Sequence, residues 1–285
     1  MNQLDPAWVA DLAQRALAED LGGPDGVDVT SVATIPADQV DVVDLVARAS
    51  GVIAGLSVAQ AVFSAVGVTE FDARVGDGTV VHRGDVLATI SGPTRALLTA
   101  ERTALNLISR TSGIATHTRR WTAAIEGTGA RVLDTRKTTP LLRPLEKYAV
   151  RAGGGTNKRM GLYDVAMIKD NHKLAAGSIT AAYDAVRSAF PDVPVQVEVT
   201  TVAEAVEAVT AGATFLLLDN MEPALLCEVV AAVGGKAELE ATGGLTLERA
   251  REFAETGVDY LSVGALTHSS PILDIALDLR PRKAS

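Results

Sequence analysis

The sequence has a single cysteine, Cys227, among its 285 residues. One cysteine excludes an internal disulfide bond and a metal site built from several cysteines. Apolar residues surround it, so we expect a packed, buried thiol on a helix rather than a nucleophile. Low cysteine usage is also typical of reducing compartments, and we expect a cytoplasmic location.

Long hydrophobic runs are missing as well. No segment comes close to the roughly 20 consecutive apolar residues that cross a membrane. The amino-terminal segment lacks the basic stretch and apolar core of a secretory signal, so none is expected. Asp5 and Pro6 instead predict the start of an amphipathic helix, as N-cap and first helical residue. With 47% hydrophobic and 21% charged residues, the chain has the composition of a globular protein.

Positive charge is scarce overall but locally concentrated. The formal net charge is −9, which argues against general nucleic-acid binding. The segment from residue 131 to residue 173, however, contains ten of the 26 Lys and Arg residues and only four acidic residues. A local excess of cations of this size predicts an anionic ligand.

The first third of the chain predicts a small sheet. Residues 28–92 contain short alternating runs separated by glycines, typical of antiparallel strands, with a helix near 57–66. The segment at 77–90 is similar to a hairpin of biotinyl and lipoyl carrier domains, but it lacks a lysine that would carry the group, so we expect only a structural hairpin. Residues 93–127 predict two helices, with the helical run broken or bent at Ser112 and Gly113.

Strands and helices alternate from about residue 130 onward, which predicts a parallel sheet, open or closed. Helical segments at 178–190, 201–212 and 245–257 separate the later strands. The six apolar runs expected to form buried strands are 131–134, 164–169, 193–199, 214–219, 237–241 and 259–263.

Charged and polar residues follow the ends of these runs. In a β/α barrel the carboxyl ends of the strands share one face, which holds the active site. Arg136 and Arg159 suit forked recognition of carboxylates or phosphates, and Lys137 and Lys169 act as point charges. The other cations of the region, Arg143, Lys147 and Arg151, lie in a helix-like run, where we expect a solvated surface.

The acids Glu198 and Asp219 end two successive strands. Two carboxylates so placed can hold Mg²⁺, directly or through water, while substrate phosphates complete its coordination. Ion pairing with Lys137 or Lys169 is the alternative, and both can hold at once.

Three glycine-bearing loops can present backbone N–H groups to a phosphate. They lie at 153–159, 242–244 and 263–266, the last two before expected helix starts. Simple strand-to-helix turns without a ligand are an equally good interpretation of the glycines alone.

The motifs taken together resemble a known family, the quinolinate phosphoribosyltransferases, also called carboxylating nicotinate-nucleotide pyrophosphorylases. The resemblance spans nearly the whole chain in order. The motifs are ERTALN at 101–106, DTRKT at 134–138, GGGTNKR at 153–159, KDNH at 169–172, EV at 198–199, LLLDN at 216–220, EATGG at 240–244 and VGALTHS at 263–269.

The resemblance implies an α/β fold with an N-terminal open-faced α/β sandwich and a C-terminal incomplete α/β barrel of the type II phosphoribosyltransferase kind. We expect the sandwich at 1–112, the barrel at 113–269, and a tail at 270–285 that packs back on the sandwich. It further implies a homodimer and a glycosyltransferase reaction of NAD biosynthesis. Quinolinate and phosphoribosyl pyrophosphate give nicotinate mononucleotide, pyrophosphate and CO₂ with the help of Mg²⁺.

Site residues follow from the same resemblance. Those expected to bind quinolinate are Arg102 from the partner subunit, Arg136, Lys158, Arg159 and Lys169. Those expected to bind phosphoribosyl pyrophosphate are Lys137, Glu198, Asp219, Thr242, Gly243, Gly244, Gly264, Ala265 and His268. The expected catalytic residues are Lys137, Lys169, Glu198 and Asp219, the two acids also serving the metal.

Two positions depart from the family pattern. Lys158 stands where the family often has histidine, which keeps a cation but loses an imidazole that titrates near neutrality. At this position we therefore expect anion binding rather than proton transfer. Thr242 stands where serine is usual and keeps the hydroxyl.

Other functions fit parts of the pattern. A molybdenum-associated paralogue and a nicotinate phosphoribosyltransferase are related alternatives. Lys169 at a barrel strand end could form the Schiff base of an aldolase, although the many other cations argue against it. A non-catalytic anion-binding protein is disfavoured by Glu198 and Asp219, which repel an anion in the absence of a metal.

Overall fold

The computed structural model describes residues 3–281, which divide into two compact units. Within those residues, unit 1 consists of 3–117, 144–154 and 269–281, and unit 2 of 118–143 and 155–268. Residues 144–154 therefore cluster with unit 1, although the expected barrel domain began at 113. The expected tail 270–285 clusters with unit 1 as far as residue 281, and its last four residues lie outside the described part.

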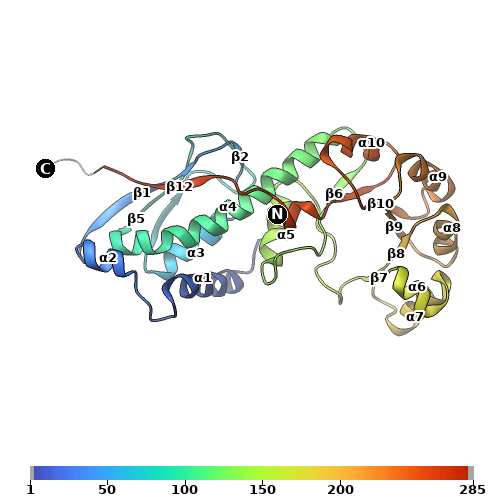
Figure 1. Ribbon diagram of the computed structural model, residues 1–285, viewed down its shortest axis with the longest axis horizontal. Helices are drawn as coiled ribbons and strands as arrows, with labels where there is room; N and C mark the ends of the chain where they lie inside the picture. Colours follow the sequence, from blue (N-terminus) through green and yellow to red (C-terminus); the bar gives the residue numbers. More distant parts are fainter. Residues whose placement is uncertain (1–2, 282–285) are drawn as a thin grey trace. The chain divides into compact units, whose positions relative to one another are not determined.

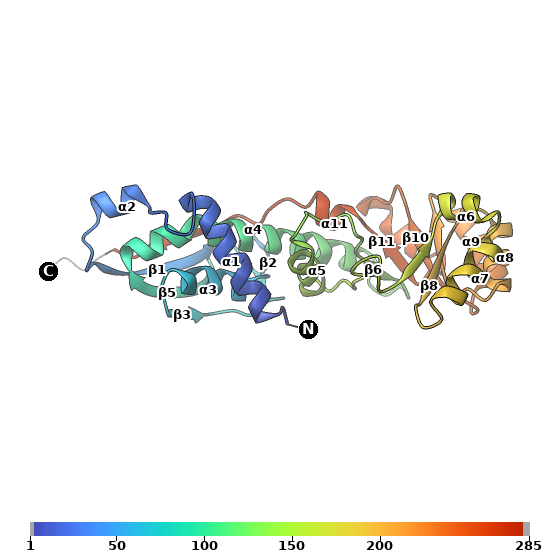
Figure 2. The same ribbon diagram turned by 90° about the horizontal axis from the view of Figure 1, so that it is seen from below.

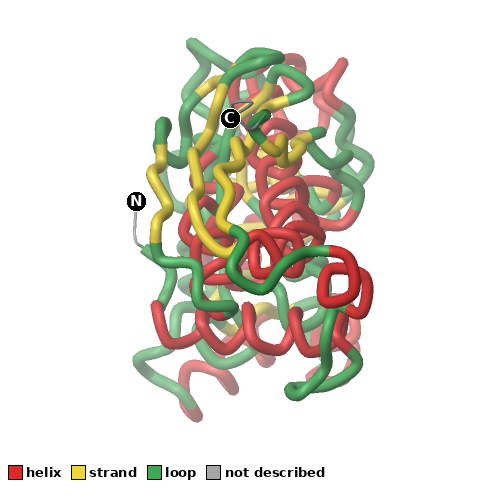
Figure 3. The backbone as a smooth tube through the Cα atoms, turned by 90° about the vertical axis from the view of Figure 1, so that its left-hand side faces the viewer, coloured by secondary structure: helices red, strands yellow, loops and turns green. Residues whose placement is uncertain are grey.

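Unit 1 is built on a four-stranded antiparallel sheet with the order β12-β1-β5-β3. Its strands are β1 (Val40–Ala47), β3 (Glu70–Ala73), β5 (Val86–Pro93) and β12 (Ile275–Leu279), which lie side by side in Figure 3. Alternation along β1 buries Val43 and Leu45 and leaves Asp44 partly exposed, where it accepts hydrogen bonds from Arg280. One face of the sheet thus faces the core, and the other remains partly open, which agrees with the expected open-faced sandwich.

Three helices and a small two-stranded antiparallel sheet complete this part of unit 1. They are α1 (Pro6–Leu21), α2 (Val29–Thr34), α3 (Leu56–Ala65) and the strand pair β2 (Gly51–Val52) and β4 (Val80–Val81). Asp5 caps α1 by accepting a hydrogen bond from the Ala7 N–H, and Pro6 is the first helical residue, as predicted. In Figure 2, α1 and α3 pack beside each other.

The predicted break at Ser112 and Gly113 is wrong. Residues Thr94–Ala124 form one continuous helix of 31 residues, α4. Gly113 is needed for a close approach instead, since a Cβ atom there would lie 2.1 Å from the carbonyl oxygen of Pro271. Gly113 is thus a glycine because another segment of the chain packs closely against the helix at this point, and not because the helix ends there.

Helix α5 (Arg143–Ala152) also differs from its prediction as a solvated basic surface. Lys147 is fully buried, and so is Glu146, whose carboxylate accepts a 2.9 Å hydrogen bond from Arg110. Arg143 is partly buried and donates hydrogen bonds to Thr138 Oγ1 and to the carbonyl oxygen of Met160. The spacing of charged residues along this helix did not show which of its faces are covered by neighbouring elements.

Unit 2 contains a six-stranded parallel sheet with the order β6-β11-β10-β9-β8-β7. All six predicted strands are present, as β6 (Arg131–Leu133), β7 (Ala166–Ile168), β8 (Val195–Val199), β9 (Phe215–Asp219), β10 (Glu238–Thr242) and β11 (Tyr260–Ser262). Within the described chain, β6 and β7 form the two edges and do not pair with each other. The sheet is thus an incomplete barrel.

Helices connect the strands on the outside of this sheet. In Figure 1, α7, α8 and α9 follow one another along β8, β9 and β10. The connecting helices are α6 (Asp170–Ala176), α7 (Ile179–Ala189), α8 (Val202–Thr210), α9 (Pro223–Val233), the short η1 (Leu247–Arg249) and α10 (Ala250–Ala254). Helix α11 (Ala265–His268) follows the last strand of the sheet, β11.

Cys227 lies on α9 but is exposed, so the prediction of a buried thiol is wrong. The buried residues of that helix are Leu226, Val229 and Val233, and Cys227 falls on the opposite side. Throughout residues 3–281, no helix is both long and apolar enough to span a membrane.

Candidate active site

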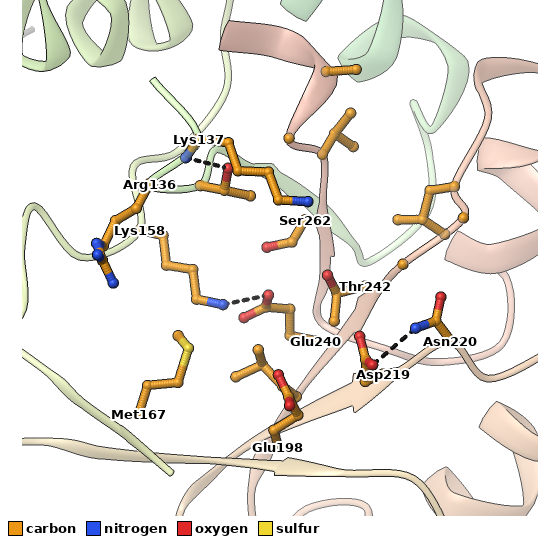
Figure 4. A pocket seen from close by; sticks show the side chains of 18 of the residues that line it. Arg136, Lys137, Lys158, Met167, Glu198, Asp219, Asn220, Glu240, Thr242 and Ser262 are labelled. Atoms are coloured by element: carbon orange, nitrogen blue, oxygen red, sulfur yellow. Dashed lines mark hydrogen bonds and ion pairs between the residues drawn. The ribbon is translucent and has the colours of Figure 1, made fainter. Parts of the chain in front are cut away.

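A cavity of about 730 Å³ opens at the carboxyl ends of the unit 2 strands (Figure 4). Apart from Arg102, it is lined by every residue that the sequence singled out for the site. These are Arg136, Lys137, Lys158, Arg159, Lys169, Glu198, Asp219, Thr242, Gly243, Gly244, Gly264, Ala265 and His268. Parallel strands bring these residues together because all their carboxyl ends open onto one side.

Asp134, at the end of β6, fixes the loop that carries two of the cations. It is fully buried and accepts hydrogen bonds from Asn157 Nδ2 at 2.5 Å and from the Lys158 backbone N–H at 2.8 Å. A parallel bridge between Leu133 and Thr156 extends the sheet edge in the same place. The loop is therefore attached to the barrel rather than free at its mouth.

Lys158 reaches across the cavity to Glu240 on β10 (Figure 4), with 2.5 Å between Lys158 Nζ and Glu240 Oε1. The lysine side chain is 7% exposed and the glutamate side chain is fully buried. Burial lowers the pKa of Lys158, Glu240 opposes that effect, and the positive charges of Arg159 and Lys169 add to it. The second carboxylate oxygen of Glu240 is buried and makes no hydrogen bond within the described chain.

Two arginines supply further positive charge. Arg136 lines the cavity, and its Nε atom is buried without a hydrogen-bond partner among residues 3–281. Arg159 is anchored by a 2.9 Å hydrogen bond from Nη1 to the carbonyl oxygen of Val165. Burial and the neighbouring charge of Arg136 lower the pKa of Arg159, which still stays protonated at neutral pH. Like charges held this close together favour binding of an anion between them.

The two acids at the strand ends have partners of their own. Lys169 forms an ion pair with Glu198 on β8, as the sequence allowed. Asp219 on β9 accepts a 2.9 Å hydrogen bond from Asn220 Nδ2. Asn220 has a left-handed backbone, with φ +53°, and its N–H donates to the Thr242 carbonyl oxygen.

Glu198 and Asp219 offer hard oxygen donors in one cavity, which suits Mg²⁺. Among the described residues no group of three or more His, Cys, Asp or Glu side chains could hold a metal ion. The donor set thus fits a metal only if substrate oxygens and water complete the coordination.

Two glycine segments line another side of the cavity. Gly243 and Gly244 follow β10 with φ +86° and +62°, a region that other residues rarely adopt. A Cβ atom at Gly243 would lie 2.2 Å from Asn220 Oδ1, and one at Gly264 would lie 2.9 Å from Lys137 Cδ. Both glycines therefore let side chains and backbone approach closely beside the cavity.

Arg102 lies on α4 in unit 1, where it is exposed, and is not among the residues lining this cavity. Conversely, the predicted site residues did not include Glu240 or Ser262, which line the cavity and each have a buried oxygen without a hydrogen bond in the described chain. Period-two alternation places Glu240 and Thr242 on the same face of β10, which was the signal available for Glu240.

Comparisons with known proteins agree over nearly the whole chain. The model for the family "Quinolinate phosphoribosyl transferase, N-terminal domain" matches residues 28–112, and that for the C-terminal domain matches 114–278. A curated "Nicotinate-nucleotide pyrophosphorylase [carboxylating]" from Mycobacterium leprae is 48% identical, covering 94% of this chain and 96% of the relative. A "Probable nicotinate-nucleotide pyrophosphorylase [carboxylating]" from Bacillus subtilis is 43% identical, covering 94% and 92%. A crystal structure of NadC from Streptococcus pyogenes has a TM-score of 0.93 at 37% identity, covering 99% of this chain and 100% of that one.

Proposed function

The chain belongs to the quinolinate phosphoribosyltransferase family, and on that premise we propose that it transfers the phosphoribosyl group of phosphoribosyl pyrophosphate to quinolinate. The products are nicotinate mononucleotide, pyrophosphate and CO₂, which makes the protein a decarboxylating pentosyltransferase of NAD biosynthesis. The single observation that carries the proposal is a cavity in which five cations and two strand-end acids meet.

The cations account for recognition of quinolinate. A pyridine ring with two adjacent carboxylates needs several donors on one side, and Arg136, Lys158, Arg159 and Lys169 line the same cavity. The planar guanidinium of Arg136 lines the cavity and suits a forked contact with a carboxylate. Each charge-assisted hydrogen bond contributes about 1.5–3 kcal/mol.

Phosphoribosyl pyrophosphate occupies the side of the cavity near Lys137 and the glycine segments. Lys137 is held through its carbonyl oxygen, which accepts a 2.8 Å hydrogen bond from Thr267 Oγ1, and its side chain passes against Gly264. Lys137 stabilises the departing pyrophosphate, and Thr242, Gly243, Gly244, Gly264, Ala265 and His268 bind the 5′-phosphate region.

Glu198 and Asp219 act on the ribose. As pyrophosphate leaves C1′, positive charge develops on the sugar, and carboxylates offset such charge. The same two acids would hold Mg²⁺ together with substrate oxygens, and a bound Mg²⁺ neutralises charge on the diphosphate. The pyridine nitrogen then attacks C1′ and becomes a pyridinium, which withdraws electrons and allows the 2-carboxylate to leave as CO₂. Lys169 contacts the carboxylates near the reacting centre.

An aldolase function is not favoured. The amine of Lys169 is ion-paired with Glu198, whereas a Schiff-base lysine needs a free amine for attack on a carbonyl group.

Arg102 requires a second subunit in this proposal. It is exposed on α4, and we assign it to the quinolinate site of a partner in a homodimer. Mixing an Arg102→Ala subunit with a Lys137→Ala subunit tests this assignment, because hybrid dimers regain one intact site. Activity that stays absent after mixing contradicts a shared site. A cytoplasmic location stays a prediction from the low cysteine content.

The experiment that tests the function is direct. The protein is mixed with phosphoribosyl pyrophosphate, Mg²⁺ and either quinolinate or nicotinate, and nicotinate mononucleotide and CO₂ are measured. We expect nicotinate mononucleotide with equimolar CO₂ from quinolinate only. Product from nicotinate without CO₂ indicates a nicotinate phosphoribosyltransferase, and no product from either indicates a paralogue with other chemistry.

A further inference from the structure

The reaction leaves one proton unaccounted for. When the 2-carboxylate leaves as CO₂, the electron pair of the broken C–C bond stays on C2 of the pyridinium ring. The product carries hydrogen at C2, so a proton must reach that carbon inside the cavity. This inference rests on the proposed function, and none of the roles given above supplies the proton.

Most cations of the cavity are poorly suited to supply it. Arg136 and Arg159 do not release a proton at accessible pH. Lys169 is tied to Glu198, and its side chain is 47% exposed, so water screens it. Lys137 lies beside Gly264, on the side of the cavity assigned to the pyrophosphate.

Lys158 differs from all of these in its surroundings. Its side chain is 7% exposed, and it ends 2.5 Å from Glu240 Oε1. Asp134 binds the backbone N–H of the same residue, which fixes the root of the side chain as well as its tip. A lysine side chain that is held at its root and at its ammonium group, inside the substrate cavity, is a pre-positioned acid.

The carboxylate of Glu240 can accept further hydrogen bonds in this arrangement. It is fully buried, yet only Oε1 is paired with Lys158, and Oε2 makes no hydrogen bond among residues 3–281. A buried carboxylate with an unsatisfied oxygen is costly, and it holds the ammonium in place through charge. Ser262, on the adjacent strand β11, has a second unsatisfied oxygen in the same cavity.

The charges around Lys158 favour release of its proton. Burial lowers its pKa first, Arg159 from the same loop and Lys169 at the end of β7 lower it further, and Glu240 from β10 acts against them. A lysine with a lowered pKa is a better acid than an ordinary one at the pH of the cell. The position that the sequence suggested for anion binding alone thus has the surroundings of an acid.

We propose that Lys158 is the general acid that protonates C2 after decarboxylation, and that Glu240 is the residue that positions it. The C2–carboxylate bond breaks, CO₂ leaves, and the electron pair remains on C2. A bond between C2 and hydrogen forms as an N–H bond of Lys158 breaks. The neutral amine regains a proton from water before the next turnover.

The test follows the single-turnover rate of nicotinate mononucleotide formation as a function of pH, in the wild type and in Lys158→Met, Lys158→His and Glu240→Gln. We expect the wild-type rate to fall on an alkaline limb below 10.5, the ordinary pKa of lysine. Lys158→Met should lower the rate about 10²–10⁴-fold and abolish the limb. In Lys158→His the limb should move toward about pH 6.5, the ordinary value for histidine.

Glu240→Gln provides a second, independent readout. Loss of the charge that raises the pKa of Lys158 should move the alkaline limb to lower pH, which a merely structural role for Glu240 does not predict. Lys173→Met is the matched control. This lysine is also largely buried and ion-paired, with Asp170 and Glu204, but it does not line the cavity, so limb and rate should stay as in the wild type.

One pattern overturns the proposal. If Lys158→Met and Lys158→His raise the quinolinate KM but leave the single-turnover rate at saturation and its alkaline limb unchanged, Lys158 only binds a carboxylate. Failure of the proposed function looks different, because the wild type itself then forms no nicotinate mononucleotide.

Discussion

Gly113 and the carbonyl oxygen of Pro271 lie so close that a Cβ atom on the glycine would be 2.1 Å from that oxygen. The contact lies within unit 1, where the chain from Pro271 runs on to Leu273, whose N–H donates a 3.0 Å hydrogen bond to the Ser109 carbonyl oxygen. Helix α4 therefore carries a glycine in its interior for the sake of a neighbouring segment.

Gly113→Ala should destabilise the protein, and the sign of the effect is informative. In an ordinary helix interior, alanine is more stable than glycine by about 0.5–1 kcal/mol. Here the new methyl group overlaps backbone atoms that cannot rotate away, so the free energy of unfolding should fall by about 1–3 kcal/mol. Urea denaturation measures the change, and a stabilised variant would show that the contact is not tight.

Gly243→Ala should impair binding of phosphoribosyl pyrophosphate. The methyl group would lie 2.2 Å from Asn220 Oδ1, and the backbone at φ +86° already disfavours it. Displacement of Asn220 also disturbs its hydrogen bond to Asp219, so we expect at least a tenfold higher KM for phosphoribosyl pyrophosphate, or about 1.4 kcal/mol. The control is Gly235→Ala, which has a similar φ of +78° but no atom within 4 Å of its Cβ position. Equal KM values in the two variants would contradict a role for the contact.

Arg136→Ala should raise the quinolinate KM. The substitution removes a charge-assisted contact of about 1.5–3 kcal/mol, which corresponds to roughly a 10–150-fold increase in KM. Arg136→Lys should restore little, because a point charge does not reproduce the planar fork. Steady-state kinetics measure both, with Arg15→Ala, an exposed residue on α1, as the control. Near-wild-type kinetics for Arg136→Ala would rule out the assignment.

Tyr148→Phe should weaken unit 1. The hydroxyl of Tyr148 on α5 donates a 2.6 Å hydrogen bond to Asp77 Oδ2, and Asp77 also accepts hydrogen bonds from the N–H groups of Gly55 and Leu56 at the start of α3. Loss of a hydrogen bond to a charged acceptor should lower the free energy of unfolding by about 1.5–3 kcal/mol. Tyr183→Phe, which removes a more exposed hydroxyl bonded to the Gly212 carbonyl oxygen, serves as the control and should have a smaller effect.

The stability of unit 2 should depend on Glu204 at acid pH. Burial raises the pKa of Glu204, but hydrogen bonds from Thr200 and Lys173 outweigh it, so the net pKa lies below the ordinary 4.5. A carboxyl group with a lowered folded-state pKa stabilises the fold above its unfolded pKa and loses that contribution as pH falls through the folded value. The wild type should therefore be more stable than Glu204→Gln at pH 7, and the difference should shrink below about pH 4.5. Urea denaturation from pH 7 to pH 3 measures it, and a constant difference would contradict the assignment.

Local pattern was sufficient for the strands and for most of the site. The six parallel strands of unit 2 were visible as apolar runs, and the rule that their carboxyl ends share one face placed Arg136, Lys169, Glu198 and Asp219 in one cavity. These features depend on residues close together in the sequence, or on a topology with few alternatives. They can therefore be predicted from one amino-acid sequence.

Contacts between segments far apart in the sequence could not be predicted from local pattern. Whether Gly113 interrupts α4, whether Lys147 is buried, and whether Cys227 is exposed depend on which segments pack against each helix. A residue pattern specifies a helix and its apolar side, but a charged residue is buried only when another element happens to cover it.

The amino-acid sequence by itself determined the order of the elements, the face on which the charged residues gather and the family of the protein. Only the tertiary structure decided that Lys158 reaches Glu240, 82 residues away, and is nearly buried there. The physical reason is that proton affinity depends on burial and on charges brought close by folding, neither of which is a property of sequence spacing.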